Sequence, residues 1–449
     1  MGEDGEMVRR HRIRLGLAVI VMIAIFGVIT FTFLVMAKAL ANDGPRITET
    51  PMADSPWKDN FERDHLWMAT SSAGPNPPGR VAKVGNQERV VTTPMDHSRG
   101  RRTTFQPQAG KLYDQVGHLF TRDEEQLAYT ARRGTSWYMV FNGQKWGPYR
   151  AEPYQPEFSP DGKRLAYWIA EEGGRPAVID GERGIRRDDW AGFRGGSHFI
   201  FSADSRHVAY AVPAEKHTMR YVIDGEEQAV YALVYGLVFS PEGGHVAYLV
   251  NQDGKTFVVH DGREGQRYDA VQSSVVRRAR KGIDYISSLL FSDNGENLTY
   301  GVFDHGEGFV VLNGKELTRH NSRILQIEIS PDGRRLAYRV DDRTILTNDG
   351  ATVTIPAGYQ DGSLEFSPDG KYLVFVAEHN GRQSVYVNGK PGRDYAKIQR
   401  LYNEHNQTTG YVAFHAPNAF HYFVEKDLGK HDLLVVEETL PRQEENIAK

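Results

Sequence analysis

The chain has 449 residues, of which 40% are hydrophobic and 25% are charged, and its formal net charge is −4 at pH 7. This slightly acidic balance argues against binding of nucleic acid through a general excess of positive charge. The sequence contains no cysteine, which excludes disulfides, thiolate metal sites and cysteine nucleophiles. Its 45 glycines are typical of a protein built from many tight turns.

The N-terminal segment predicts a membrane anchor. An uncharged apolar run at 15–37 is long enough to cross a bilayer as a helix, and four arginines precede it, at positions 9, 10, 12 and 14. By the positive-inside rule residues 1–14 are cytoplasmic and the rest is extracytoplasmic, in the periplasm or at the cell surface. The alternative is a cleaved signal with its site near Ala39-Leu40-Ala41, which would make the protein secreted. The length of the run favours the anchor.

Residues 38–110 are predicted to be a proline-rich tether with uncertain strands. Ser55-Pro56 is a good helix start, and the following Trp57, Phe61 and Met68 fall near one side of that helix. Such a helix either packs as a peg or binds a partner, and packing is the commoner use of an apolar stripe. The stretch 81–93 predicts one or two strands.

A repeated turn dominates the rest of the chain. In Phe366–Phe375 the sequence Ser-Pro-Asp-Gly separates two apolar segments, and Pro368 and Gly370 supply the fixed and the positive φ that a tight turn needs. The same first turn recurs at 158–162, 201–205, 239–243, 291–295 and 329–333, with a degraded copy at 120–124 and a weaker one after Phe414. Each copy therefore predicts a hairpin of two strands, A and B.

A second turn alternates with the first and predicts strands C and D. Asn-Gly or Asp-Gly between apolar segments is a strong hairpin signal. These dipeptides begin at Asn142, Asp180, Asp224, Asp261, Asn313, Asp349 and Asn388. A spacing of about 37 to 52 residues suits four-stranded propeller blades. We therefore predict an all-β fold, a β-propeller of about eight four-stranded blades at 111–440, followed by a polar tail at 441–449; seven blades result if the copy after Phe414 is not a true blade.

The two ends of the predicted propeller suggest how its ring closes. Leu112–Gly117 is similar to the segments 267–271 and 394–398, which we interpret as D strands. The last copy ends after a C strand at 433–436, with no evident D strand. Closure by the early D strand would cover two exposed strand edges.

The Phe-Ser-Pro-Asp-Gly-x-x-Leu-Ala-Tyr form at 158–167 resembles the WD-repeat-like propeller repeat of TolB and of the propellers in prolyl-oligopeptidase-type enzymes. The resemblance covers residues 111–440 and implies the fold, because the shared residues form turns and core. The sequence has no Gly-x-Ser-x-Gly nucleophile motif, and a predicted span and tether stand where TolB has an α/β domain. The hairpins also look like those of uncharacterised bacterial exported propellers, which implies no activity.

The strand order predicts two unlike faces. The A–B and C–D turns lie on one face and are short, whereas the B–C loops and the D–A connections lie on the other and vary in length. The longest D–A connections are 272–288 and 399–410. We expect binding on this variable face. The candidate binding residues are Arg277, Arg278, Arg280, Lys281, Asp284 and Tyr285. The alternative for this basic segment is a solvated loop.

The sequence predicts no catalytic residues, no cofactor and no metal site. Histidines such as His245, His260 and His305 lack any recognised metal-binding spacing, and turn aspartates are explained by backbone geometry. The first hypothesis is a membrane-anchored extracytoplasmic propeller, a scaffold or sensor that binds a protein or an envelope component and no nucleic acid. The alternative is a propeller enzyme, a hydrolase or lyase with loop carboxylates at the channel mouth.

Overall fold

The structure is a computed structural model in which part of the chain is described. Residues 15–37, the predicted helix that starts at Ser55-Pro56 and the tail beyond Pro441 lie outside the described residues. No helix in the described part is long and apolar enough to cross a membrane. The described residues are 46–51, 79–84, 87–92, 108–109, 113–122, 126–172, 174–184, 198–215, 218–272, 289–356, 358–360, 363–402, 408–426 and 433–441.

The described residues form antiparallel sheets and no α-helix. Six sheets have four strands, and two more have a first strand split into two pieces, which gives eight four-stranded units. Sheet 1 contains β5 (Gln115–Arg122), β6 (Gln126–Arg133), β7 (Ser136–Phe141) and β8 (Gln144–Tyr149), and sheet 2 contains β9 (Tyr154–Phe158), β10 (Leu165–Trp168), β11 (Ala177–Ile179) and β12 (Glu182–Arg183). Sheet 3 contains β13 (Ile200–Phe201), β14 (Val208–Pro213), β15 (Met219–Ile223) and β16 (Glu226–Glu227), and sheet 4 contains β17 (Leu233–Phe239), β18 (Val246–Gln252), β19 (Lys255–His260) and β20 (Arg263–Glu264).

The other four units follow in chain order. Sheet 5 contains β21 (Ala270–Val271) and β22 (Leu289–Phe291) as the two pieces of its first strand, then β23 (Leu298–Asp304), β24 (Glu307–Leu312) and β25 (Lys315–Glu316). Sheet 6 contains β26 (Gln326–Ile329), β27 (Leu336–Arg339), β28 (Thr344–Thr347) and β29 (Thr352–Thr354), and sheet 7 contains β30 (Glu365–Phe366), β31 (Leu373–His379), β32 (Arg382–Val387) and β33 (Lys390–Tyr395). Sheet 8 contains β34 (Lys397–Ile398) and β37 (Ala413–Ala416) as the two pieces of its first strand, then β38 (Ala419–Glu425), β39 (Leu433–Thr439) and β1 (Arg46–Pro51). The predicted eight blades are confirmed, including the copy after Phe414.

Two smaller sheets accompany the eight units. One contains β2 (Gly79–Val84), β3 (Gln87–Thr92) and β4 (Gln108–Ala109), which confirms strands in the stretch 81–93. The other is the hairpin of β35 (Leu401–Tyr402) and β36 (Thr408–Gly410).

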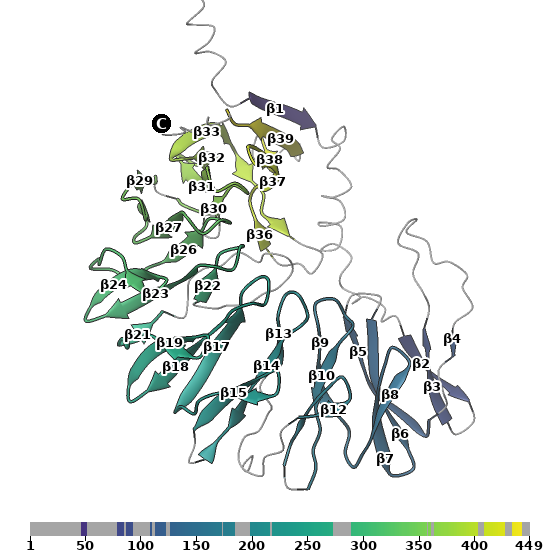
Figure 1. Cartoon of the computed structure of the whole chain (residues 1–449). Coiled ribbons are helices and arrows are strands. Elements are labelled where there is room, and N and C mark those ends of the chain that lie inside the picture. The colour runs from purple at the N-terminus through teal and green to yellow at the C-terminus, as the bar shows by residue number, and fades with distance from the viewer. Residues whose placement is uncertain are drawn as a thin grey trace, which may run out of the picture.

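The sheets follow one another in an arc (Figure 1). First strands of consecutive sheets contact each other, as β13 does with β17 and β17 with β22, so the sheets converge on the side where their first strands lie. A layer of buried apolar side chains fills each interface between consecutive sheets. Between sheets 2 and 3, for example, Trp168 packs against Phe199 and Tyr210, with ring centroids 4.8 and 5.4 Å apart. This is the blade architecture of a β-propeller.

The strand that completes sheet 8 is not the one predicted. β1 pairs with β39 over six residue pairs, from Arg46 opposite Thr439 to Pro51 opposite Leu434. Glu49 of this strand accepts hydrogen bonds from Arg393 Nη1 and Tyr395 Oη, both at 3.0 Å, which ties β1 to sheet 7 as well. Thus part of the predicted tether belongs to the sheets.

The prediction that Leu112–Gly117 closes the ring is therefore wrong. Val116 pairs with Ala131, so the segment opens sheet 1 as its first strand. The similar segments divide in the same way: Tyr268 bridges Thr256 of sheet 4, whereas Val271 pairs with Val302 of sheet 5. Each of these segments contains the last residue of one sheet and the first residues of the next. In the sequence the two parts look like one continuous strand.

The two long segments predicted as D–A connections are insertions within first strands. In sheet 5, Val271 pairs with Val302, the amide of Gln272 donates to the Gly301 carbonyl, and Leu289 pairs with Tyr300. The pairing thus continues on β23 without a gap, although 273–288 intervenes. In sheet 8, residues between Gln399 and Ala413 interrupt the pairing with β38 at the equivalent place.

Other sheets have a β-bulge where these insertions occur. In sheet 1 the register shifts between Val116 and Leu119, and in sheet 4 it shifts between Tyr235 and Val238. A bulge already leaves residues of one strand unpaired, so extra chain can be inserted there while the ladder continues on either side. The insertions are therefore enlarged bulges of the first strand.

Candidate functional site

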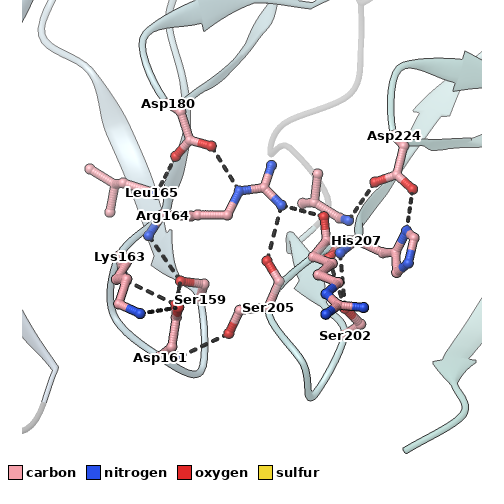
Figure 2. Close-up of polar contacts among 12 residues, drawn as sticks. Ser159, Asp161, Lys163, Arg164, Leu165, Asp180, Ser202, Ser205, His207 and Asp224 are labelled. Atoms are coloured by element: carbon pink, nitrogen blue, oxygen red, sulfur yellow. Dashed lines mark hydrogen bonds and ion pairs between the residues drawn. The ribbon is translucent and has the colours of Figure 1, made fainter. Parts of the chain in front are cut away.

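The face that holds the A–B and C–D turns, here called the turn face, is a hydrogen-bonded framework (Figure 2). Ser159 Oγ donates to Asp161 Oδ1 at 2.7 Å and accepts from the Arg164 amide at 2.9 Å, which fixes the A–B turn. Asp180 accepts from the Leu165 amide at 2.9 Å and from Arg164 Nε at 2.8 Å, which ties the C–D turn to the second strand.

Sheet 3 repeats this framework and is bonded to sheet 2 (Figure 2). Here His207 Nδ1 lies 2.7 Å from Asp224 Oδ2. Between the sheets, the Asp161 amide donates to Ser205 Oγ at 2.9 Å and Arg164 Nη1 donates to the Ser205 carbonyl at 3.1 Å. The side chains of this face therefore join neighbouring sheets.

The same contact recurs between sheets 6 and 7. Arg335 Nη1 donates to the carbonyls of Gly370 and Lys371 at 2.9 and 2.8 Å, and its guanidinium lies 5.2 Å from the ring centroid of Phe366. Arg164 lies 5.4 Å from Phe201 in the equivalent way. A role in the fold accounts for these polar groups.

The sequence neighbours Asp204, Ser205 and His207 do not form a catalytic triad. Ser205 Oγ accepts from the amide of Asp161, and His207 is paired with Asp224. The hydroxyl of Ser202, the other serine of this turn, donates to Asp204 Oδ1 at 2.5 Å. These contacts support the interpretation of the turn residues as structural.

The opposite face, here called the loop face, holds a polar cluster between sheets 4 and 5. It consists of Lys255, Asp269, Asp304 and His305. Lys255 Nζ lies 2.6 Å from Asp269 Oδ1, and the amide of Asp269 donates to Asp304 Oδ1 at 3.0 Å. The hydrogen bond from Lys255 and that from the His305 amide lower the pKa of Asp269. Asp269 is therefore an anion that binds cationic groups rather than a proton donor near neutral pH.

Two exposed apolar side chains lie along the same face. Val230 and Leu233 are 42% and 44% exposed, and they are the large hydrophobic residues most open to solvent in the described part of the chain. The Ala232 amide between them donates to Gln252 Oε1 at 2.8 Å, and Gln252 pairs with Lys255 in the hairpin of β18 and β19. The apolar pair thus adjoins the polar cluster.

Two groups of side chains in the described residues have metal-ligand geometry. One is Asp269, Asp304 and His305, and the other is His245, His260 and Asp261. In the first group cations already balance the carboxylates, because Lys255 contacts Asp269 and Arg319 Nη1 lies 3.8 Å from Asp304. That group therefore offers a divalent ion little net charge. In the second group, the ion-pair partners of Asp261 are His245 and His260, which are themselves potential metal ligands.

The candidate binding residues from sequence remain untested. Arg277, Arg278, Arg280, Lys281, Asp284 and Tyr285 lie outside the described residues, in the segment that joins β21 to β22. The sequence did not reveal the apolar pair, which only its exposure distinguishes. Nor did it reveal either metal-like group, because folding brings together residues that are apart in sequence, such as Asp269 with Asp304 and His245 with His260. An alignment of the repeats would have pointed to His260, which stands where the other copies have a side chain that does not ionise.

Comparisons with known proteins found distant likenesses in structure only. No protein-family model and no curated protein matches the sequence. A eukaryotic initiation factor is 13% identical with a TM-score of 0.36, covering 79% of this chain and 92% of its own. KlHsv2 with loop 6CD replaced by a Gly-Ser linker is 14% identical with a TM-score of 0.30, covering 61% and 89%.

The β-propeller domain of Cps50 (Swd1) from Myceliophteria thermophila is also 14% identical, with a TM-score of 0.27 and coverage of 69% and 97%. All three scores are below 0.5, so the fold assignment rests on the sheets of this chain itself. On that ground the described part of the chain is all-β and contains eight propeller-type blades.

Proposed function

We propose that the protein is a non-catalytic interaction scaffold that binds another protein with its loop face. The observation that carries this proposal is the exposed apolar pair, Val230 and Leu233, beside the polar cluster. Apolar side chains that border charged ones are typical of protein-binding surfaces, in which burial supplies affinity and charges supply orientation. On the turn face, by contrast, the polar side chains hold the sheets together.

The state of the carboxylates supports a scaffold over the hydrolase or lyase alternative. Asp304 has a side chain only 10% exposed, and it accepts a hydrogen bond from the Asp269 amide. Asp269 is held by Lys255. A general acid needs a raised pKa, whereas the hydrogen bond from Lys255 lowers the pKa of Asp269.

We further propose that residues 15–37 anchor the protein in a membrane and that the blades are extracytoplasmic, where they bind an envelope protein. This part of the proposal rests on the apolar run and the preceding arginines. Protease treatment of intact cells and of spheroplasts, with blotting for the C-terminal blades, tests it. Blades that are cleaved only after lysis would contradict it.

The binding surface is tested by in-cell crosslinking followed by mass spectrometry. Leu233→Asp places a charge in the apolar pair, and because the side chain is 44% exposed we expect a change of no more than about 0.5 kcal/mol in stability. Arg334→Glu on the turn face, where the side chain is 86% exposed, is the matched control. We expect one partner to crosslink to the native protein and to Arg334→Glu, and to be lost from Leu233→Asp.

A second variant tests the predicted basic segment. Reversal of Arg277, Arg278, Arg280 and Lys281 to glutamate should weaken the same crosslink if that segment contributes to the surface. A partner that is retained by Leu233→Asp and lost from Arg334→Glu would place binding on the turn face and overturn the proposal.

A further inference from the structure

The repeats show one position at which a single sheet differs in kind from the others. This position is the last residue of the third strand in each of sheets 1 to 7, and it stands just before the Asn or Asp of the C–D turn. In the ladder this residue pairs with the second strand of its sheet, near the start of that strand. Ile223 pairs with Ala209, and His260 pairs with Ala247. In sheet 6 the turn begins at Asn348, one residue before the Asp-Gly pair. The residues at this position are Phe141, Ile179, Ile223, His260, Leu312, Thr347 and Val387.

His260 is the ionisable member of this set, and its environment does not satisfy it. The side chain is 39% exposed, yet its Nε2 atom is shielded from solvent and has no hydrogen-bond partner. A buried ring nitrogen without a partner is costly, so a residue of this kind needs an explanation.

Two further ligand atoms lie beside that nitrogen. Asp261 Oδ2 is 3.6 Å from His260 Nε2 and 2.7 Å from His245 Nδ1. Asp261 Oδ1 accepts from the Val246 amide at 2.9 Å, which orients the carboxylate so that Oδ2 faces the two rings. The ligand atoms of all three residues lie within 4.8 Å of one another.

We propose that His245, His260 and Asp261 bind a divalent transition-metal ion of the Zn²⁺ class on the turn face of sheet 4. Two imidazoles and one carboxylate are a ligand set that suits Zn²⁺, Ni²⁺ or Cu²⁺, whereas Ca²⁺ and Mg²⁺ prefer sets of oxygen atoms. Three protein ligands leave a fourth position to water or to a ligand from a partner. The hydrogen bond from the Val246 amide to Asp261 would be the supporting contact that metal-binding carboxylates usually have.

Sheet 3 is an internal control for this proposal. It has the same pair of histidine and aspartate, since His207 Nδ1 lies 2.7 Å from Asp224 Oδ2. Its residue at the distinguishing position is Ile223. The pair alone therefore belongs to the repeat, and the addition of His260 is what makes a three-ligand set.

The first experiment is a titration of the purified protein with Zn²⁺ by calorimetry, repeated with Mg²⁺. The native protein should bind one Zn²⁺ that His260→Ile does not bind, or binds more than about tenfold more weakly, and Mg²⁺ should not compete. His260→Ile introduces the side chain of sheets 2 and 3, so it should fold normally, which circular dichroism and a melting curve check. Equal Zn²⁺ binding by the native protein and a folded His260→Ile would overturn the proposal.

The reciprocal variant guards against a loss caused by altered folding. Ile223→His in the His260→Ile background rebuilds the three-ligand set in sheet 3, beside His207 and Asp224. We expect this variant to regain one Zn²⁺, and Co²⁺ in place of Zn²⁺ should give the visible absorption of a low-coordinate site in both the native and the rebuilt protein. A rebuilt variant that is folded but binds no Zn²⁺ would show that this arrangement of ligands is not sufficient, contrary to the proposal.

Discussion

The turn face and the loop face differ in what their side chains contact. On the turn face a serine, an aspartate and an arginine or histidine of one sheet bond within that sheet, and the arginines also donate to the backbone of the next sheet, as Arg164 does with Ser205. On the loop face, contacts such as that between Lys255 and Asp269 are exposed, and apolar side chains such as Leu233 remain open to solvent. One face thus stabilises the arrangement of sheets, and the other is left free to vary.

The sharpest test of this difference uses two glycines of sheet 4 with nearly the same backbone. Gly243 on the turn face has φ of 77°, and Gly254 on the loop face has φ of 75°. A Cβ on Gly243 would lie 2.9 Å from the Asp204 carboxylate, whereas a Cβ on Gly254 would meet nothing within 4 Å. We expect Gly243→Ala to lower the free energy of unfolding by about 3 kcal/mol and Gly254→Ala by about 1 kcal/mol.

Urea unfolding of the two variants measures these two changes in the free energy of unfolding. The positive φ costs both variants the same, so their difference isolates the close approach of sheet 3 to the turn of sheet 4. Equal losses of stability in the two variants would mean that sheet 3 can move away from the turn of sheet 4 without cost. The turn face would then be no more tightly packed than the loop face.

A smaller effect is expected from the arginines that join sheets. Arg335 on the turn face is partly buried and donates to two carbonyls of sheet 7, whereas Arg382 on the loop face is exposed and donates to the Lys426 carbonyl at 3.3 Å. Charge-assisted hydrogen bonds in a partly buried site are worth more than exposed ones. We expect Arg335→Ala to cost about 2 kcal/mol and Arg382→Ala less than about 0.5 kcal/mol in urea unfolding. A larger loss for Arg382→Ala would reverse the comparison.

The smallest effect concerns acid stability, which the turn face should govern. Burial raises the pKa of Asp161, but hydrogen bonds from Ser159 and the Lys163 amide outweigh it and lower that pKa from 3.8 to about 2. Because the folded pKa lies below the unfolded one, Asp161 contributes stability above about pH 4. That contribution is lost as the pH falls from about 4 to about 2.

Ser159→Ala removes one of these donors and should therefore flatten the fall in stability within this pH window. Unfolding followed by fluorescence at several pH values between 2 and 5 measures the slope. An unchanged slope in Ser159→Ala would show that the hydrogen bonds of this turn do not set the acid sensitivity.

The repeat made most of the fold predictable from sequence. Pro368, Asp369 and Gly370 encode a turn by local geometry, and seven further copies reveal the sheets without knowledge of long-range contacts. The closing strand was not predictable in this way, because β1 has no turn signal and its pairing with β39 depends on residues nearly 400 positions apart. The insertions in sheets 5 and 8 were misplaced because the tyrosine that ends one sheet and the valine or isoleucine that begins the next stand three residues apart and look like one strand.

The candidate site was less predictable than the fold. Leu233 is one of many leucines, and only its exposure distinguishes it. Lys255, Asp269 and His305 come from three different strands or links, so their meeting depends on how sheets 4 and 5 pack. His260 could not be recognised from the sequence alone. A histidine before an aspartate becomes unusual only when the repeats are aligned by their strand pairing and the equivalent residues are compared.

The pairing of β1 with β39 has a consequence for the order in which the protein can be made. Residues 46–51 are synthesised nearly 400 residues before residues 434–439, yet each is the other's neighbour in sheet 8. Sheets 1 to 7 each contain strands that are close in sequence and can form as they are synthesised. Strand β1 must therefore wait for its partner until β39 has been synthesised, and its docking completes sheet 8 at a time when sheets 1 to 7 can already have formed.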